Sequence, residues 1–135
     1  MQYKTGLRTT RVTDLVTALG ATSRLLVYNN TGAIPTPTQS PTVNGAVPLA
    51  IFTLANPVGT VTTGVLTFSA ISSVTAAASG TPNFWRMIDG TTDDGTHTQA
   101  QGTAGVGSGE LSFGSTVASG GTVSITSIVI TEGNP

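Results

Sequence analysis

Short apolar runs separated by glycines and prolines fill the chain after Gly20, and their spacing limits the possible folds more than any other feature. They follow one another roughly every 8 to 15 residues, which is typical of an all-β sandwich or jelly roll. No amphipathic segment after Gly20 is long enough for the helical crossover of a parallel sheet. We therefore expect one domain, residues 1–135, with a β-sandwich body at residues 46–135.

Side-chain alternation predicts which strands are buried on both faces. In SRLLVYN, Leu25 and Val27 face one side and Leu26 and Tyr28 face the other, so both faces should be at least partly covered. TVSITSIVITEG, residues 122–133, reads as the strongest strand, and we expect its second half to be covered on both sides. NFWRMID alternates in the same way, with Phe84, Arg86 and Ile88 on one face and Trp85 and Met87 on the other.

A short α-helix is predicted before the strands, over residues 7–19. Its apolar residues recur at three- and four-residue intervals, and Gly20 stands where a helix commonly ends. Such a short helix is marginal alone, so its apolar stripe must pack on its own domain or on a neighbouring subunit. We interpret residues 1–24 as an N-terminal arm containing this helix.

Charge is scarce and unevenly distributed. Charged residues make up 8% of the chain, against about 25% in ordinary soluble domains, which suits a chain that lives in an assembly. The first 24 residues carry about +3 and the remainder about −4, so contacts between the head of one copy and the body of another are electrostatically permitted. A helix with a solvated basic face is the alternative. The candidate partner-binding bases are Lys4, Arg8, Arg11 and Arg24.

NNTGAIPTPTQSPTVNG, residues 29–45, is the clearest loop. Its prolines Pro35, Pro37 and Pro41 remove backbone donors and favour extended geometry. A loop of this length is either a functional arm or disordered. We favour an arm that orders against a neighbour, which makes the three prolines candidate partner-binding residues.

IDGTTDDGTHTQ holds the only histidine, His97, and three of the six acids, Asp89, Asp93 and Asp94. Closely spaced acids bind hard cations, but the spacing matches no EF-hand and one histidine makes no zinc triad. Asp-Gly pairs are typical of turns. We therefore predict a turn between two strands and no metal site.

No catalytic or cofactor site is predicted. The chain has no cysteine, and a serine triad would have to use His97, for which no partner is marked. GTAGVGSGE lacks the lysine of a phosphate-binding loop. Five bases argue against specific nucleic-acid binding, and neither a secretory signal nor a membrane-spanning run is evident.

Four segments give the chain a resemblance to small virion structural proteins of tailed bacteriophages and prophages. These are YKTGLR leading into the helix, LLVYN before the Pro-rich loop, FWRMIDGTT, and ASGGTVSITSIVITEGN. Together they span nearly the whole chain, and within this class it most resembles the β-sandwich proteins that decorate or cement capsids. The resemblance implies binding to the major capsid protein and to copies of itself, a homo-oligomer in the virion, and synthesis in the bacterial host cytoplasm.

Two other functions remain open. One is a tail, neck or fibre-associated virion protein that binds host glycans through Trp85, Tyr28 and the loop from Asp93 to His97. The other is a small metal-dependent enzyme, which would need a divalent ion that is lost on Asp93→Ala. The tail, neck or fibre-associated protein would bind host surface glycans and would not bind phage heads.

Overall fold

The protein is β-rich with one N-terminal α-helix, as predicted. The computed structural model describes residues 2–133, and the helix α1 spans Thr5–Leu19. The strands within these residues are β1 Arg24–Asn29, β2 Val47–Thr53, β3 Gly59–Thr62, β4 Val65–Phe68, β5 Val74–Thr75, β6 Phe84–Ile88, β7 Thr98–Val106, β8 Leu111–Phe113, β9 Thr122–Val123 and β10 Val129–Thr131, and a 3-10 turn, η1, covers Pro41–Asn44.

The largest sheet has five strands in the order β2-β1-β6-β7-β8. Its pairs are antiparallel except β7 and β8, which are parallel. Leu26 on β1 lies opposite Arg86 on β6, and Val27 lies opposite Trp85. Residues 25–28 are all buried, which confirms that this strand is covered on both faces.

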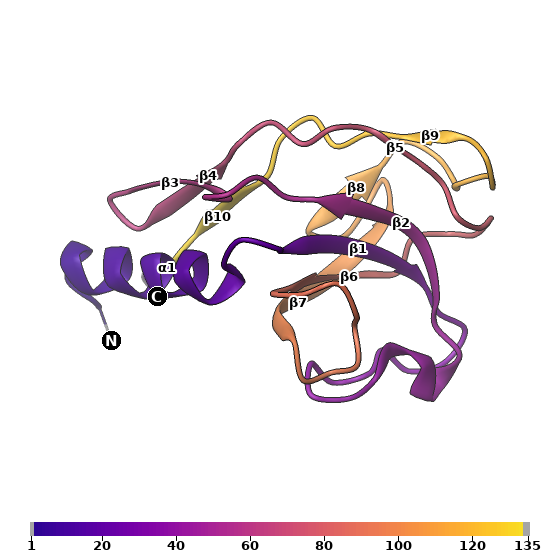
Figure 1. Cartoon of the computed structure of the whole chain (residues 1–135), viewed down its shortest axis with the longest axis horizontal. Coiled ribbons are helices and arrows are strands. Elements are labelled where there is room, and N and C mark those ends of the chain that lie inside the picture. Colours follow the sequence, from indigo (N-terminus) through magenta and orange to yellow (C-terminus); the bar gives the residue numbers. More distant parts are fainter. Residues whose placement is uncertain (1, 134–135) are drawn as a thin grey trace.

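Two small sheets complete the fold, in the order β10-β4-β3 and β5-β9. In Figure 1, β3, β4 and β10 lie beside α1, and β5 and β9 lie at the other end of the molecule, above β1. The larger apolar core joins these parts, and the five-stranded sheet contributes Leu25, Val27 and Met87 to it. Leu66 on β4 is fully buried there. The opposite face carries a smaller core of Leu26, Tyr28, Ala46, Phe84 and Ile88.

The helix packs on its own domain. Its buried residues Val12 and Leu19 belong to the larger core, and α1 contacts β3 and β4. Gly20 has a positive φ of 64° and donates its N–H to the Val16 carbonyl, which confirms the predicted helix end. Because α1 covers this core, deleting it would expose apolar surface and weaken the rest of the domain. No helix among the described residues is long and apolar enough to cross a membrane.

Two sequence predictions about strands were incomplete or wrong. The strand β3 was missed, because its apolar pattern is short. It is set by a hairpin with β4 whose turn residues, Thr63 and Gly64, have φ of 51° and 82°. Residues 122–133 do not form one strand: β9 pairs with β5, β10 pairs with β4, and the chain crosses between the two small sheets. Val129, expected to be covered, is 55% exposed because its side chain lies on the face of β10 opposite to Ile130, which packs against the larger core.

Candidate functional site

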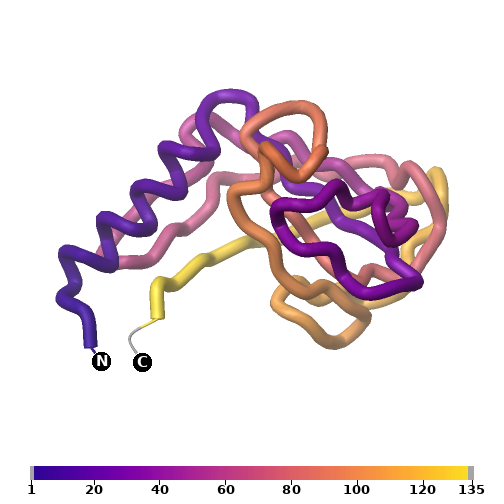
Figure 2. The backbone as a smooth tube through the Cα atoms, turned by 90° about the horizontal axis from the view of Figure 1, so that it is seen from below, coloured from indigo at the N-terminus to yellow at the C-terminus, as the bar shows by residue number. Residues whose placement is uncertain are grey.

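The Pro-rich loop folds back over the second face of the five-stranded sheet. Viewed from that side, it lies across the strands (Figure 2). Pro35 and Pro41 are buried against the domain, whereas Pro37 is exposed. The loop is therefore ordered within the single chain, and the prediction that it orders against a neighbour is not needed to explain its conformation.

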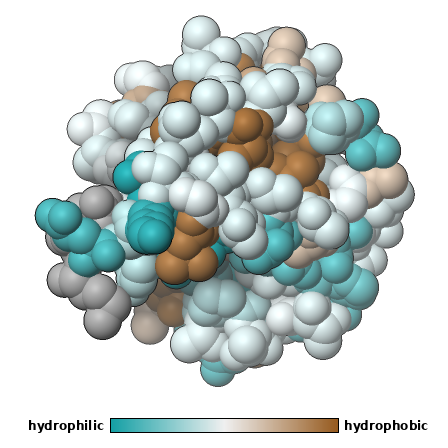
Figure 3. All heavy atoms as spheres, turned by 90° about the vertical axis from the view of Figure 1, so that its left-hand side faces the viewer, coloured by the Kyte–Doolittle hydropathy of each residue, from teal (hydrophilic) through white to brown (hydrophobic). Residues whose placement is uncertain are grey.

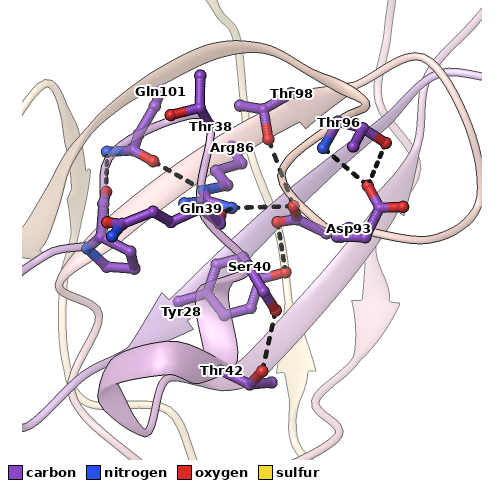
Figure 4. Close-up of polar contacts among 12 residues, drawn as sticks. Tyr28, Thr38, Gln39, Ser40, Thr42, Arg86, Asp93, Thr96, Thr98 and Gln101 are labelled. Atoms are coloured by element: carbon purple, nitrogen blue, oxygen red, sulfur yellow. Dashed lines mark hydrogen bonds and ion pairs between the residues drawn. The ribbon is translucent and has the colours of Figure 1, made fainter.

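Arg86 on β6 ties the loop to the sheet. Its side chain is fully buried, and the guanidinium lies under the loop (Figure 4). Nη2 donates to the Thr36 carbonyl at 2.9 Å, and Nη1 donates to the Gln39 carbonyl at 2.8 Å. Nε donates to Oε1 of Gln101 at 2.7 Å. One planar cation thus binds two loop carbonyls and the neighbouring strand β7 at once.

Asp93 supplies the charge that balances Arg86. Its Oδ1 lies 3.0 Å from Nη1 of Arg86, and its side chain is 2% exposed. Its Oδ2 accepts a hydrogen bond of 2.8 Å from the Tyr28 hydroxyl. A buried ion pair is costly to desolvate unless further hydrogen bonds satisfy both ions, and here both ions have them.

Tyr28 completes the network from β1. Its ring stacks on Phe84 with centroids 4.8 Å apart and an interplanar angle of 11°. Burial, together with the hydrogen bond to Asp93 and the charge of that carboxylate, raises the pKa of Tyr28 above its ordinary value. The hydroxyl therefore stays protonated as a donor at neutral pH.

Further side chains satisfy the carbonyls of the loop. Gln101 donates to Pro35 O at 2.8 Å, and Asn44 donates to Ala33 O at 2.7 Å. Gly95 has a φ of +88°, and a Cβ there would lie 2.5 Å from the Gln39 carbonyl carbon, so this turn approaches the loop too closely for a side chain. Prolines remove donors from the loop, and the strands β6 and β7 together with Asn44 of the loop itself provide donors for its acceptors.

Residues 89–97 form the turn between β6 and β7, as predicted. His97 Nδ1 lies 2.7 Å from Asp89 Oδ1 on the surface. Hydrogen bonds from the side chain and backbone of Thr96 lower the pKa of Asp94. No group of three metal-ligating side chains occurs within residues 2–133.

The inward position of Asp93 is what the sequence analysis missed. The three acids of the turn were treated as one set, although only Asp93 faces the buried arginine. Arg86 was the available signal, because a base on the apolar face of a buried strand requires an acid nearby. Its partner follows seven residues later in the sequence.

The four predicted partner-binding bases do not form one patch. Arg8 donates through Nε to the Glu132 carbonyl at 3.0 Å, and Arg11 forms an ion pair with the Glu132 carboxylate. Arg24 reaches the Thr91 carbonyl at 3.4 Å. Lys4 is exposed at the N-cap of α1. Arg8 and Arg11 therefore hold Glu132 against the helix, in addition to any role at a partner.

Apolar side chains project from the loop region. Ile34 is 39% exposed and Val43 is 60% exposed, and Val47 follows at the start of β2 with 44%. Their backbone is fixed by the contacts of Arg86, Gln101 and Asn44. The loop thus presents apolar groups on a rigid support.

The residues suggested for glycan binding do not converge. Tyr28 pairs with Phe84 and Val27 pairs with Trp85, so Tyr28 and Trp85 lie on opposite faces of the sheet. Tyr28 is also buried. Comparisons with known protein families, curated proteins and solved structures find no match for the chain.

Proposed function

We propose that the chain is a structural protein of a tailed-bacteriophage virion and acts as a capsid decoration, or cement, protein. The proposal takes its class from the resemblance of the four sequence segments and from the low charge of the chain. It further assigns the β-rich body to the sandwich or jelly-roll type. The partners would be the major capsid protein and other copies of this chain, on the surface of the capsid.

The observation that carries the binding role is the rigidly held Pro-rich loop. Association is weakened by the entropy lost when loops and side chains are ordered at an interface. Here Arg86, Gln101 and Asn44 order the backbone of the loop beforehand. Ile34 and Val43 then offer apolar contacts with little further loss of entropy.

The mechanism in this proposal is mechanical. The loop of residues 29–45 contacts one capsid subunit while the body rests on its neighbour, so the chain bridges the joint. Repetition over a symmetric shell adds avidity, which allows each contact to be weak. Arg86 acts as a positioning residue, because it reaches the partner only through the loop that it holds. Such a role needs no catalytic residue or cofactor.

Sedimentation with empty, expanded heads tests the proposal. The heads should come from the phage that encodes the chain, and binding is measured by co-sedimentation in a sucrose gradient. Val43→Ser should lower the bound fraction at least several-fold, because it removes an exposed apolar group of the loop. Val106→Ser is the matched control, since Val106 is 41% exposed on β7, outside the loop, and should lower binding clearly less than Val43→Ser.

Cryo-electron microscopy of the complete particle is the second test of the proposal. Density for the chain at many symmetry-related positions on the capsid supports the proposal. Density only at the portal vertex, tail or fibres would replace it with the tail, neck or attachment role. Equal binding by Val43→Ser and the parent chain would remove the loop from the interface.

A further inference from the structure

A cleft opens on the opposite side of the five-stranded sheet from the Pro-rich loop. Its larger part, about 360 Å³, has β7 and β8 on one wall and residues 128–131 on the other. A second part of about 240 Å³ continues between β8 and residues 124–127. The two parts share the lining residues Glu110 and Leu111, so they lie next to each other and are together named the cleft. The larger part alone is within the roughly 300–1,000 Å³ range of ligand pockets.

Two continuous stretches of chain form the walls of this cleft, and one face of the five-stranded sheet forms its floor. Successive residues of a strand point to opposite faces, so a wall built by a strand face uses every second residue. Here four consecutive residues, 110–113, line one wall, and eight consecutive residues, 124–131, line the other. Such continuous lining indicates that these two stretches border the cleft edge-on, whereas Leu25, Trp85 and Met87 line its floor from one face of β1 and β6.

The strands at these walls are also unpaired on one side. β8 and β10 are the terminal strands of their sheets. The Ile128 carbonyl accepts the Phe68 N–H of β4, and the Glu132 N–H donates to the carbonyl of Gly64, just before β4. By alternation, the peptide groups of Val129 and Thr131 face away from β4. An extended segment placed in the cleft would find backbone donors and acceptors along its length, as in recognition by strand addition.

The side chains of the cleft specify the charge of its occupant. Trp85, Met87 and Ile130 make it apolar, and Glu110 is the only charged residue that lines its described walls. The Trp85 ring and the Glu110 carboxylate both approach the Cα of Gly102 so closely that a side chain there would collide with them. Oε2 of Glu110 accepts the Thr103 N–H at 2.9 Å, and Oε1 accepts no hydrogen bond from residues 2–133.

An aromatic face beside a carboxylate attracts a cation on an apolar stem. Figure 3 shows hydrophobic side chains exposed at the surface on the end of the molecule that carries α1. We propose that this cleft binds an extended segment of a partner protein by strand addition, with a lysine or arginine seated between Trp85 and Glu110. This site is independent of the Pro-rich loop. If the peptide experiment failed, the proposal of a capsid decoration role would therefore still stand.

Trp85 is the only tryptophan, so intrinsic fluorescence of the full chain reports on this cleft directly. The probe is a blocked heptapeptide of alternating threonine and valine with lysine at its centre. It should change the Trp85 emission in a saturable way. The same peptide with norleucine in place of lysine should bind roughly tenfold more weakly, because it keeps the stem and loses the charge. A peptide with alternate backbone nitrogens methylated should not bind.

Glu110→Gln tests the carboxylate with little change of shape. The variant should bind the lysine and norleucine peptides equally, whereas Asp94→Asn, which neutralises an exposed acid elsewhere, should keep the preference. Equal binding of the lysine and norleucine peptides by the parent chain, or binding of the methylated peptide, would overturn the proposal. So would the absence of any fluorescence change. Self-association of the parent chain in sedimentation that is lost in Glu110→Gln would identify a second copy as the occupant and overturn the partner assignment.

Discussion

The two faces of the five-stranded sheet are covered by different kinds of interaction. On one face, α1 and the small sheets pack through apolar side chains such as Leu66 and Val12. On the other, the Pro-rich loop is held mainly by hydrogen bonds and one ion pair centred on Arg86. Both coverings exclude water. The first is stabilised by the burial of apolar surface, and the second by pairing buried hydrogen-bond donors with acceptors.

The two kinds of interaction differ in how many conformations of the covering segment they allow. Apolar burial is non-directional, so many arrangements of similar volume satisfy it. A buried guanidinium must find acceptors in fixed directions, and few loop conformations supply them. We infer that the network contributes more to the choice of loop conformation than to net stability, since buried ion pairs often add little net stability.

The largest effect is expected from Arg86→Ala. It leaves the Asp93 carboxylate buried without its cation and removes the donors to Thr36 and Gln39. Urea denaturation should show a free energy of unfolding lower by about 3–5 kcal/mol. Amide exchange of residues 29–45 should also accelerate, because the loop loses its support.

The double variant Arg86→Met, Asp93→Leu separates stability from loop conformation. Replacing a buried ion pair with apolar groups is often neutral, so much of the lost stability should return. The loop should nevertheless exchange rapidly. A loop as protected in the double variant as in the parent chain would show that the network does not select its conformation.

Leu66→Ala should damage the apolar face by a smaller amount. Leu66 is fully buried on the central strand of its small sheet. The cavity should lower the free energy of unfolding by about 3 kcal/mol in the same assay. Local exchange of the Pro-rich loop should remain slow, and faster local opening would mean that the two faces are coupled.

Tyr28→Phe should remove one bond of the network. The ring still stacks on Phe84, while Asp93 loses the donor at Oδ2 and keeps Arg86. A hydrogen bond to a charged group contributes about 1.5–3 kcal/mol, and we expect a loss near the lower end. A loss as large as that of Arg86→Ala would contradict the central position of the arginine.

The same hydroxyl should make stability depend on alkaline pH. The folded state raises the pKa of Tyr28 above the ordinary value of 10.0. Below pH 10 this stabilisation is fully present, and it declines as pH rises further because the unfolded state loses its proton first. Urea midpoints measured at about pH 9 and pH 11 should differ less in Tyr28→Phe than in the parent chain.

The smallest effect is expected for His97→Ala. The His97 and Asp89 side chains are 48% and 33% exposed, so water screens their interaction. The free energy of unfolding should change by less than about 0.5 kcal/mol. A change comparable to that of Tyr28→Phe would show that the surface of the turn matters as much as its buried Asp93.

Features that depend on neighbouring residues were predictable. The helix end at Gly20, the two-sided burial of β1 and β6, and the turn at residues 89–97 all follow from periodicity or turn chemistry. The break in residues 122–133 was not predictable, because it arises where the chain changes sheets. The position of the Pro-rich loop was not predictable either, because Arg86 binds the carbonyls of Gln39 and Thr36, which are 47 and 50 residues away in the sequence.

The sequence by itself determined a β-rich chain with one short helix, scarce charge and a loop unable to join a ladder at its prolines. These properties follow from each residue's backbone preference and its near neighbours. Tertiary structure decided which acid of the turn faces Arg86, which bases hold Glu132, and which strand edges border the cleft. The physical reason is that ion pairs and sheet edges depend on groups that only long-range folding brings within hydrogen-bonding distance.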